Sequence, residues 1–370
     1  MGEVIKNGPD HDIEETMKAQ ADKGGEIDSW GQFLMVGLPG PRADALAREL
    51  VRDLKVGGII LFARNIETPE QVWELCRDLQ QEAQAVSDRP LLIAVDQEGG
   101  TVQRLKAPFT IIPGARELGL KASAAQVEAL ARQVARELSM VGINVDLAPV
   151  LDVARGPESP QWDRSFGADP ELVARLGAAA IKGFLAGGVI PVAKHFPGLG
   201  DTRVDSHKDL PRSLAGDPQR QVDLIPFREA VNSGAPAIMT AHLVVPEWDS
   251  RPATLSPEIL GNRLRRDLGF AGVIITDDLE MGAIATRQAV PDAAREALVA
   301  GADLLLICNN IEAVWDTARV LAGERGLTPQ AGDAALRLRR LRERINLPSH
   351  GLQEVREYFR LPPEARGRRG

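Results

Sequence analysis

Residues 189–196, VIPVAKHF, form an apolar run without alternation that ends in Lys194 and His195. A strand that is buried on both faces is apolar throughout, whereas a half-buried strand alternates apolar and polar residues. Seven more runs of this kind recur along the chain, and helical patterns lie between them. They are QFLMVGL (32–38), GGIILF (57–62), LLIAVDQ (91–97), INVDLAPV (143–150), AIMTAHL (237–243), GVIITDD (272–278) and ADLLLIC (302–308).

The helical patterns carry start signals. Thr68 precedes Pro69 and Ser256 precedes Pro257, which is the order of a capping residue and a first-turn proline. Eight strand–helix units predict a parallel sheet that closes into a single (β/α)8 TIM-type barrel, an α/β fold. A doubly wound open sheet is the structural alternative. It is disfavoured because the early strands lack the G-x-G-x-x-G opening of that fold.

The rest of the chain surrounds this barrel, which we place at residues 29–346. Residues 1–28 are polar and mostly acidic, a composition that allows disorder. The stretch 98–121 separates the third strand from its helix and predicts an elaborated loop on the active face. Residues 328–345 predict an extra C-terminal helix, and residues 347–370 a peripheral tail.

Composition restricts the possible partners. The net charge is −8 and no long basic run precedes the terminal GRRG, so we expect no nucleic-acid partner. The chain contains neither the apolar core of a signal peptide nor an apolar run of about 18 residues for a membrane span. We therefore expect a soluble, cytoplasmic protein. Cys76 and Cys308 lie in apolar elements, which predicts buried thiols rather than a disulfide. The oligomeric state stays open.

Polar residues follow the predicted strands at their carboxyl ends, where barrels of this class carry their chemistry. Because ionised side chains are rarely buried together without a use, their convergence on one rim predicts an active site. These residues are Asp96 and Arg104 after the third strand, Asp152 and Arg164 after the fourth, Lys194 and His195 on the fifth, His242 on the sixth, and Asp277 and Asp278 on the seventh.

The residue types favour hydrolysis of an acetal. Asp277 follows the buried run VIIT, so its backbone is rigidly held, as a nucleophile requires. In Asp205-Ser206-His207 the aspartate can orient an imidazole for general acid/base work. Gly198 and Gly200 would let this loop move over a substrate. We expect no metal and no cofactor.

Five motifs now support a resemblance. DQEGGTVQRL (96–105), INVDLAPVLDV (143–153), RSFG (164–167), KHFPGLGDTRVDSHKDLP (194–211) and ITDDLEMGAI (275–284) resemble the catalytic domain of glycoside hydrolase family 3. The chain is most similar to the bacterial β-N-acetylglucosaminidases of the family, which act in cell-wall (peptidoglycan) recycling. The likeness runs from Trp30 to Cys308.

The resemblance implies a retaining, exo-acting enzyme that removes terminal β-linked N-acetylglucosamine from a small glycoside or a muropeptide. Asp277 would form the glycosyl-enzyme intermediate, and Asp205 with His207 would be the acid/base dyad. The positions that match the family's −1 subsite are Asp96, Arg104, Arg164, Lys194 and His195. One departure is Leu199, where the pattern KHFPGHGDT usually has histidine, and it puts fine specificity or loop posture in question.

Other functions stay open. A phosphorylase or a β-glucosidase could use the same scaffold, since histidine carries less negative charge than a carboxylate and would let phosphate approach. A metal-dependent hydrolase would use Lys194, His195, His242 and Asp277, but the first strand lacks the expected His-x-His pair. The third alternative is a non-catalytic sugar-binding protein. The natural leaving group, whether an anhydromuropeptide or a chitin fragment, is not predicted.

Overall fold

The computed structural model describes residues 29–214, 216–347 and 350–366. The expectations for residues 1–28 and for the terminal GRRG therefore lie outside the described residues. Within the described residues, every predicted apolar run contains a strand, and the eight strands form one parallel sheet in the order β10-β1-β2-β3-β6-β7-β8-β9. The strands are β1 Leu34–Gly37, β2 Gly58–Leu61, β3 Leu92–Val95, β6 Val145–Asp146, β7 Ile190–Phe196, β8 Ala237–Thr240, β9 Val273–Ile275 and β10 Leu305–Ile307.

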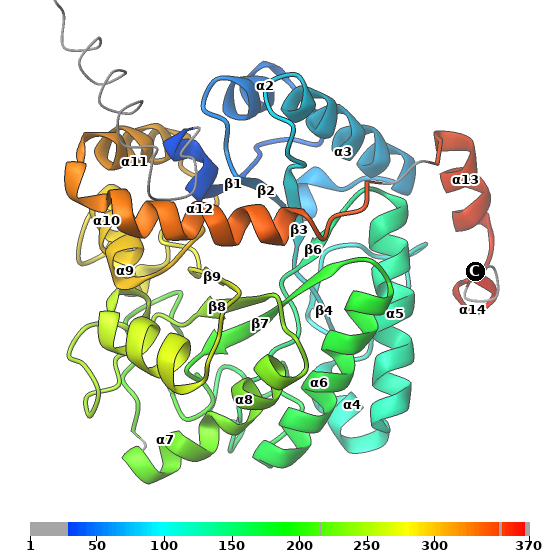
Figure 1. Ribbon diagram of the computed structural model, residues 1–370. Helices are drawn as coiled ribbons and strands as arrows, with labels where there is room; N and C mark the ends of the chain where they lie inside the picture. Colours follow the sequence, from blue (N-terminus) through cyan, green and yellow to red (C-terminus); the bar gives the residue numbers. More distant parts are fainter. Residues whose placement is uncertain (1–28, 215, 348–349, 367–370) are drawn as a thin grey trace, which may run out of the picture.

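The sheet closes on itself between β9 and β10. Backbone hydrogen bonds join the two strands and the residues that flank them in a parallel arrangement. The Asp303 N–H donates to the Ile274 carbonyl at 2.8 Å, and the Leu279 N–H donates to the Leu306 carbonyl at 3.0 Å. Helices cover the outside of the sheet all round (Figure 1). The prediction of a (β/α)8 barrel is confirmed, and the open doubly wound sheet is wrong.

The outer layer consists mainly of helices that follow the strands in turn, and α5 packs against α6 (Figure 1). Within the described residues the helices are α2 Ala45–Arg52, α3 Pro69–Gln84, α4 Ala115–Lys121, α5 Ala124–Met140, α6 Pro170–Ala186, α7 Asp217–Asp223, α8 Ile225–Asn232, η4 Glu258–Asp267, α9 Gly282–Ala285, α10 Val290–Ala300, α11 Ile311–Gly323, α12 Thr328–Arg342, α13 Leu352–Arg360 and α14 Pro363–Arg366, with short turns η1 Trp30–Phe33, η2 Ala63–Asn65, η3 Ala253–Leu255 and η5 Arg325–Leu327.

The predicted helix starts are confirmed by their caps. The Thr68 hydroxyl accepts a hydrogen bond from the Gln71 N–H at 3.1 Å, with Pro69 in the first turn of α3. The Ser256 hydroxyl likewise accepts from the Ile259 N–H at 3.1 Å at the start of η4. Each cap satisfies an N–H that the helix itself leaves without a partner.

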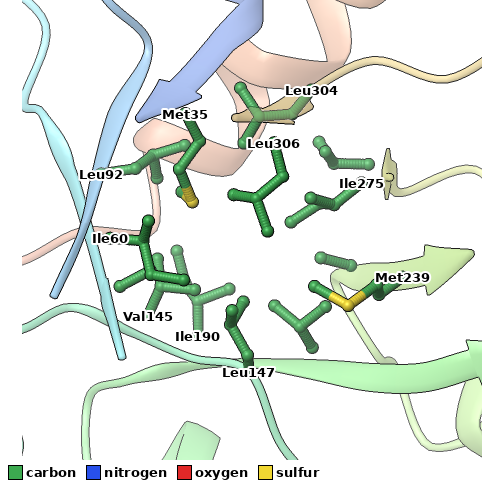
Figure 2. Packing of buried hydrophobic residues seen from close by; sticks show 14 of the residues in the cluster. Met35, Ile60, Leu92, Val145, Leu147, Ile190, Met239, Ile275, Leu304 and Leu306 are labelled. Atoms are coloured by element: carbon green, nitrogen blue, oxygen red, sulfur yellow. The ribbon is translucent and has the colours of Figure 1, made fainter. Parts of the chain in front are cut away.

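The barrel interior is filled by side chains rather than left as a pore. Figure 2 shows Met35, Ile60, Leu147, Met239 and Leu306 pointing toward one another from different strands. All five are at most 2 % exposed. Because the strands are buried on both faces, apolar residues are needed at consecutive positions, which explains the continuous runs in the sequence.

Residues 98–121 are more ordered than a loop. They contain most of an antiparallel hairpin, β4 Gln97–Gly99 with β5 Val102–Gln103, and then α4. Glu98, Val102 and Arg104 of this segment line a cavity at the carboxyl ends of the strands. The segment therefore contributes to the face of the barrel that carries this cavity.

The extra helix α12 is tied to the closing seam of the barrel by a buried carboxylate. Asp303, directly before β10, is fully buried. It accepts hydrogen bonds from Arg337 of α12 at 2.8 Å, from Arg265 of η4 at 2.6 Å and from the Ile274 N–H at 2.7 Å. One side chain thus joins α12, η4 and β9.

The segment after α12 packs on the outside of the barrel, with α13 against α3 (Figure 1). The rings of Phe359 and Phe109 lie 4.5 Å apart, and Arg366 forms a buried ion pair with Glu137 at 2.8 Å. Cys76 and Cys308 are both buried free thiols. Among the described helices, no segment combines the length and apolarity that a bilayer crossing requires.

We expect Asp303→Ala to lower the free energy of unfolding by about 3 kcal/mol, because Arg265 and Arg337 lose the buried carboxylate that they share. Urea unfolding followed by circular dichroism measures this change. The matched control is Asp316→Ala, which breaks an exposed pair with Arg319 and should cost less than about 1 kcal/mol. Equal losses in the two variants would contradict the role of Asp303 at the seam.

Candidate active site

A cavity of about 180 Å³ lies at the carboxyl ends of the strands. Its floor is formed by side chains of the barrel interior, including Ile60, Leu147, Met239 and Leu306 (Figure 2). The polar walls contain seven of the eight residues to which the resemblance assigns a role. They are Asp96, Arg104, Arg164, Lys194, His195, His207 and Asp277.

A network of alternating charges forms one wall of the cavity. Lys194 is only 3 % exposed, and its Nζ lies 2.8 Å from Asp96 Oδ1 and 2.6 Å from Glu98 Oε1. Arg164 binds Glu98 through two hydrogen bonds of 2.7 and 2.9 Å, and Arg104 lies 3.4 Å from Asp96. Such a network presents fixed donors and acceptors to a polar molecule in the cavity.

The network keeps its members charged. Burial by itself would raise the pKa of Glu98, but Lys194 and Arg164 outweigh burial and hold this pKa well below its usual range. For Lys194, burial lowers the pKa, and the carboxylates of Asp96 and Glu98 reverse this effect and raise it. The ion pairs therefore persist at neutral pH.

Asp277 follows β9 and faces the same cavity. Its Oδ1 accepts the Asp278 N–H at 2.9 Å, which fixes the orientation of the carboxylate. Burial acts to raise the pKa of Asp277, but nearby His195, His242 and Lys194 lower it overall. The carboxylate is thus ionised at neutral pH, as attack on an electrophilic carbon requires.

His195 is oriented by a buried carboxylate. Its Nδ1 lies 2.7 Å from Asp152 Oδ2, and Asp152 also accepts the Leu199 N–H at 2.7 Å. Because the Nδ1–H of His195 donates a hydrogen bond to this carboxylate, Nε2 is the ring nitrogen that remains for the cavity. His242 is different. Its Nε2 lies 2.9 Å from the Asp278 carbonyl and its Nδ1 2.8 Å from Thr254 Oγ1, so both nitrogens are used inside the protein.

Asp205 and His207 form the predicted pair at the rim of the cavity. His207 Nδ1 lies 2.9 Å from Asp205 Oδ1, which also accepts the His207 N–H at 3.0 Å. Burial acts to raise the pKa of Asp205, but the hydrogen bonds and the charge of His207 together outweigh burial and lower this pKa overall. The His207 side chain is 68 % exposed, so its Nε2 can exchange protons with a bound molecule or with water.

The loop that carries this pair is less free than its glycines suggested. Gly198 has a φ of +115°, a conformation that other residues rarely adopt. A Cβ at Gly200 would lie 2.0 Å from the Val153 carbonyl oxygen, so this glycine permits a close approach of two chain segments. Leu199 between them is 2 % exposed and lines the cavity.

One residue of the site was missed in the sequence, and a second was placed on the rim without a role. Glu98 was passed over, although it stands two positions after Asp96 behind a buried strand, and it is the carboxylate that Lys194 and Arg164 share. Asp152 was noted at a strand end but given no role. Within the described residues, no group of three or more His, Cys, Asp or Glu side chains is placed to hold a metal ion.

The sequence matches a known family over most of its length. The model of the glycosyl hydrolase family 3 N-terminal domain matches residues 22–337. A beta-hexosaminidase from Alkalilimnicola ehrlichii is 41 % identical over 288 residues, which cover 76 % of this chain and 82 % of that protein.

Solved structures agree with this match. A glycoside hydrolase family 3 β-N-acetylglucosaminidase from Paenibacillus sp. is 38 % identical with a TM-score of 0.82, and the match covers 89 % of this chain and 67 % of that one. NagZ from Neisseria gonorrhoeae, in complex with N-trifluoroacetyl-D-glucosamine, is 33 % identical with a TM-score of 0.76, covering 90 % of this chain and 96 % of that one.

We expect Asp278→Asn to stabilise the protein above neutral pH. Burial, reinforced by Glu280 and Asp277, raises the pKa of Asp278 to about 7. An acid whose pKa is raised in the folded state costs stability as pH rises from its unfolded pKa near 4 to about 7. The neutral amide avoids this cost, which is on the order of 4 kcal/mol above pH 7, because each pKa unit corresponds to about 1.4 kcal/mol.

Urea unfolding at pH 5 and pH 8 measures this effect. The stabilisation by Asp278→Asn should be larger at pH 8 than at pH 5. Asp316→Asn on the exposed face of α11 is the control and should show no such difference. A stabilisation that does not change with pH would show that Asp278 is ionised at both values.

Proposed function

The chain belongs to glycoside hydrolase family 3 and is an enzyme of the β-N-acetylhexosaminidase kind, and from this premise we propose that it releases terminal β-linked N-acetylglucosamine with retained configuration through a covalent intermediate on Asp277. One observation carries the proposal. An ionised carboxylate, Asp277, and an imidazole held by its own carboxylate, His207 with Asp205, line and border the same cavity.

In the first step, Asp277 attacks the anomeric carbon of the sugar. A bond forms between this carbon and a carboxylate oxygen while the bond to the leaving oxygen breaks. His207 gives its Nε2 proton to the leaving oxygen. Asp205 supports this transfer because its carboxylate binds the Nδ1 proton, which leaves Nε2 as the nitrogen that loses and gains a proton.

In the second step, water attacks the anomeric carbon from the side that the leaving group has vacated. His207 takes the proton of this water, and the bond to Asp277 breaks. Two inversions give a product with the original β configuration. The exposure of His207 at the rim supports this role, because the same nitrogen must meet first the leaving group and then water.

The charge network supports recognition of a single terminal sugar. Asp96, Glu98, Arg104, Arg164 and Lys194 close one side of a small cavity, which fits an exo-acting enzyme better than a cleft for a polymer. The N-acetylglucosamine specificity is supported by the relatives, since one is a β-N-acetylglucosaminidase and another binds N-trifluoroacetyl-D-glucosamine. A role in peptidoglycan recycling and a cytoplasmic location stay predictions.

We expect 4-nitrophenol release from the β-N-acetylglucosaminide to be at least about tenfold faster than from the β-glucoside at neutral pH, since one well-placed polar contact discriminates by about this factor. Added phosphate separates the hydrolase from a phosphorylase. A hydrolase keeps its rate and releases free N-acetylglucosamine, whereas a phosphorylase accelerates and forms the sugar 1-phosphate. Preference for the glucoside would contradict the proposed substrate.

We expect Asp277→Asn to lower kcat by at least about 10³-fold, because the amide cannot form the covalent intermediate. His207→Ala should lower kcat by about 10²- to 10⁴-fold, the range for a general acid/base. Asp209→Asn on the same loop, at an exposed site, is the control and should stay active. NMR of the first product anomer checks the stereochemistry, and an α anomer would overturn the two-step scheme.

A further inference from the structure

Arg220 of α7 is fully buried, although it carries a full charge and lies outside the cavity. Its guanidinium contacts the His207 loop, by which we mean residues 197–214, near both ends. Nη1 donates to the Gly198 carbonyl at 2.9 Å, and Nη2 donates to Ser213 Oγ at 2.8 Å. One rigid planar group therefore joins the first and the last residues of the loop.

A carboxylate of the loop completes this clamp. Asp201 Oδ1 lies 2.5 Å from Arg220 Nη2, while its Oδ2 accepts the Ser213 hydroxyl at 2.9 Å and the Leu214 N–H at 3.0 Å. Arg220, Asp201 and Ser213 thus form a closed set of contacts at the base of the loop. Asp205 and His207 lie in the segment that this set closes off.

The clamp is also tied to the neighbouring loop. Arg220 Nη1 lies 3.3 Å from Asp223 Oδ2, and Asp223 in turn pairs with Arg155. Arg155 follows the segment that contains Asp152, the carboxylate that orients His195. The four charges of Arg155, Asp201, Arg220 and Asp223 sum to zero. The fully buried charge of Arg220 is therefore compensated, as a buried charge requires.

The far side of the loop is fixed by weaker contacts. The Ala283 N–H donates to the Ser206 carbonyl at 3.1 Å and the Gly282 N–H to the His207 carbonyl at 3.3 Å. These bonds connect the loop to α9, which follows Asp277 in the chain. The loop is thus held firmly at its base by buried charge and lightly at its tip by backbone hydrogen bonds.

We propose that Arg220 is a positioning residue that sets the place of His207 relative to the glycosidic oxygen by clamping both ends of the His207 loop. This inference rests on the proposed acid/base role of His207. Without the guanidinium the loop ends keep only the contacts of Asp201 with Ser213 and Leu214, and the imidazole loses its fixed position while Asp277 keeps its own. The first step then lacks proton donation but retains the nucleophile.

A merely structural role would give a different result. Loss of general stability slows all substrates alike, because it reduces the amount of folded enzyme. Loss of proton donation slows substrates according to their leaving group. A 2,4-dinitrophenolate leaves without protonation, whereas an unactivated phenolate needs the proton during bond cleavage.

The test uses the full chain with Arg220→Gln and a series of aryl β-N-acetylglucosaminides from 2,4-dinitrophenyl to phenyl. We expect kcat/KM for the phenyl glycoside to fall by about 10- to 100-fold, a part of the acid/base contribution. For the dinitrophenyl glycoside it should change by less than about threefold. Arg220→Lys should recover part of the loss because it restores one charged contact. Equal losses across the series would overturn the proposal.

Arg366→Gln is the matched control. Arg366 on the tail helix α14 is also a buried arginine, and it pairs with Glu137 of α5. This substitution should lower thermal stability without dependence on the leaving group. If Arg220→Gln does not fold, Asp201→Asn and Ser213→Ala remove single contacts of the clamp, and the same dependence on leaving group is expected. A flat response in both would overturn the proposal.

A double-mutant cycle separates this inference from the proposed function. In a His207→Ala background, Arg220→Gln should add almost no further loss for the phenyl glycoside, because the two changes remove the same contribution. A full additional loss would overturn the clamp while leaving the function intact. If His207→Ala itself shows no dependence on the leaving group, the acid/base role fails, and the inference fails with it.

Discussion

The buried ammonium group of Lys194 is the constraint on which the active face depends. A charge with 3 % exposure is tolerated only with carboxylates around it, and here Asp96 and Glu98 come from the third strand end and the hairpin behind it. The hairpin must therefore fold back toward β7, which also brings Arg164 onto Glu98. The fold of this hairpin and the charge pattern of the cavity therefore depend on the same ion pairs.

The barrel could be predicted because its strands are buried on both faces. This burial produces continuous apolar runs that are easily separated from amphipathic helices, and the capping signals at Thr68 and Ser256 mark the helix starts. The hairpin within 97–103 was not predicted. Its strands are two and three residues long and have no apolar pattern, since their side chains serve the cavity rather than a core.

Some residues of the site could likewise be predicted from the sequence, and others could not. Residues at strand ends, such as Lys194 and Asp277, could be placed on one rim because parallel strands end at one edge. The partners that set the charge and orientation of these residues could not be predicted, because Glu98 and Asp152 reach them from other loops. Sequence spacing also suggested that Gly198 and Gly200 are hinges. The close approach of Gly200 to Val153 instead shows that glycine there allows two segments to pack.

At position 199 the protein uses the main chain, since the Leu199 N–H binds the carboxylate that orients His195. Any residue except proline supplies this donor. The hydrogen bond to Asp152 therefore does not depend on which side chain stands at position 199. A pattern search that demands one residue type here would reject chains whose catalytic geometry is intact.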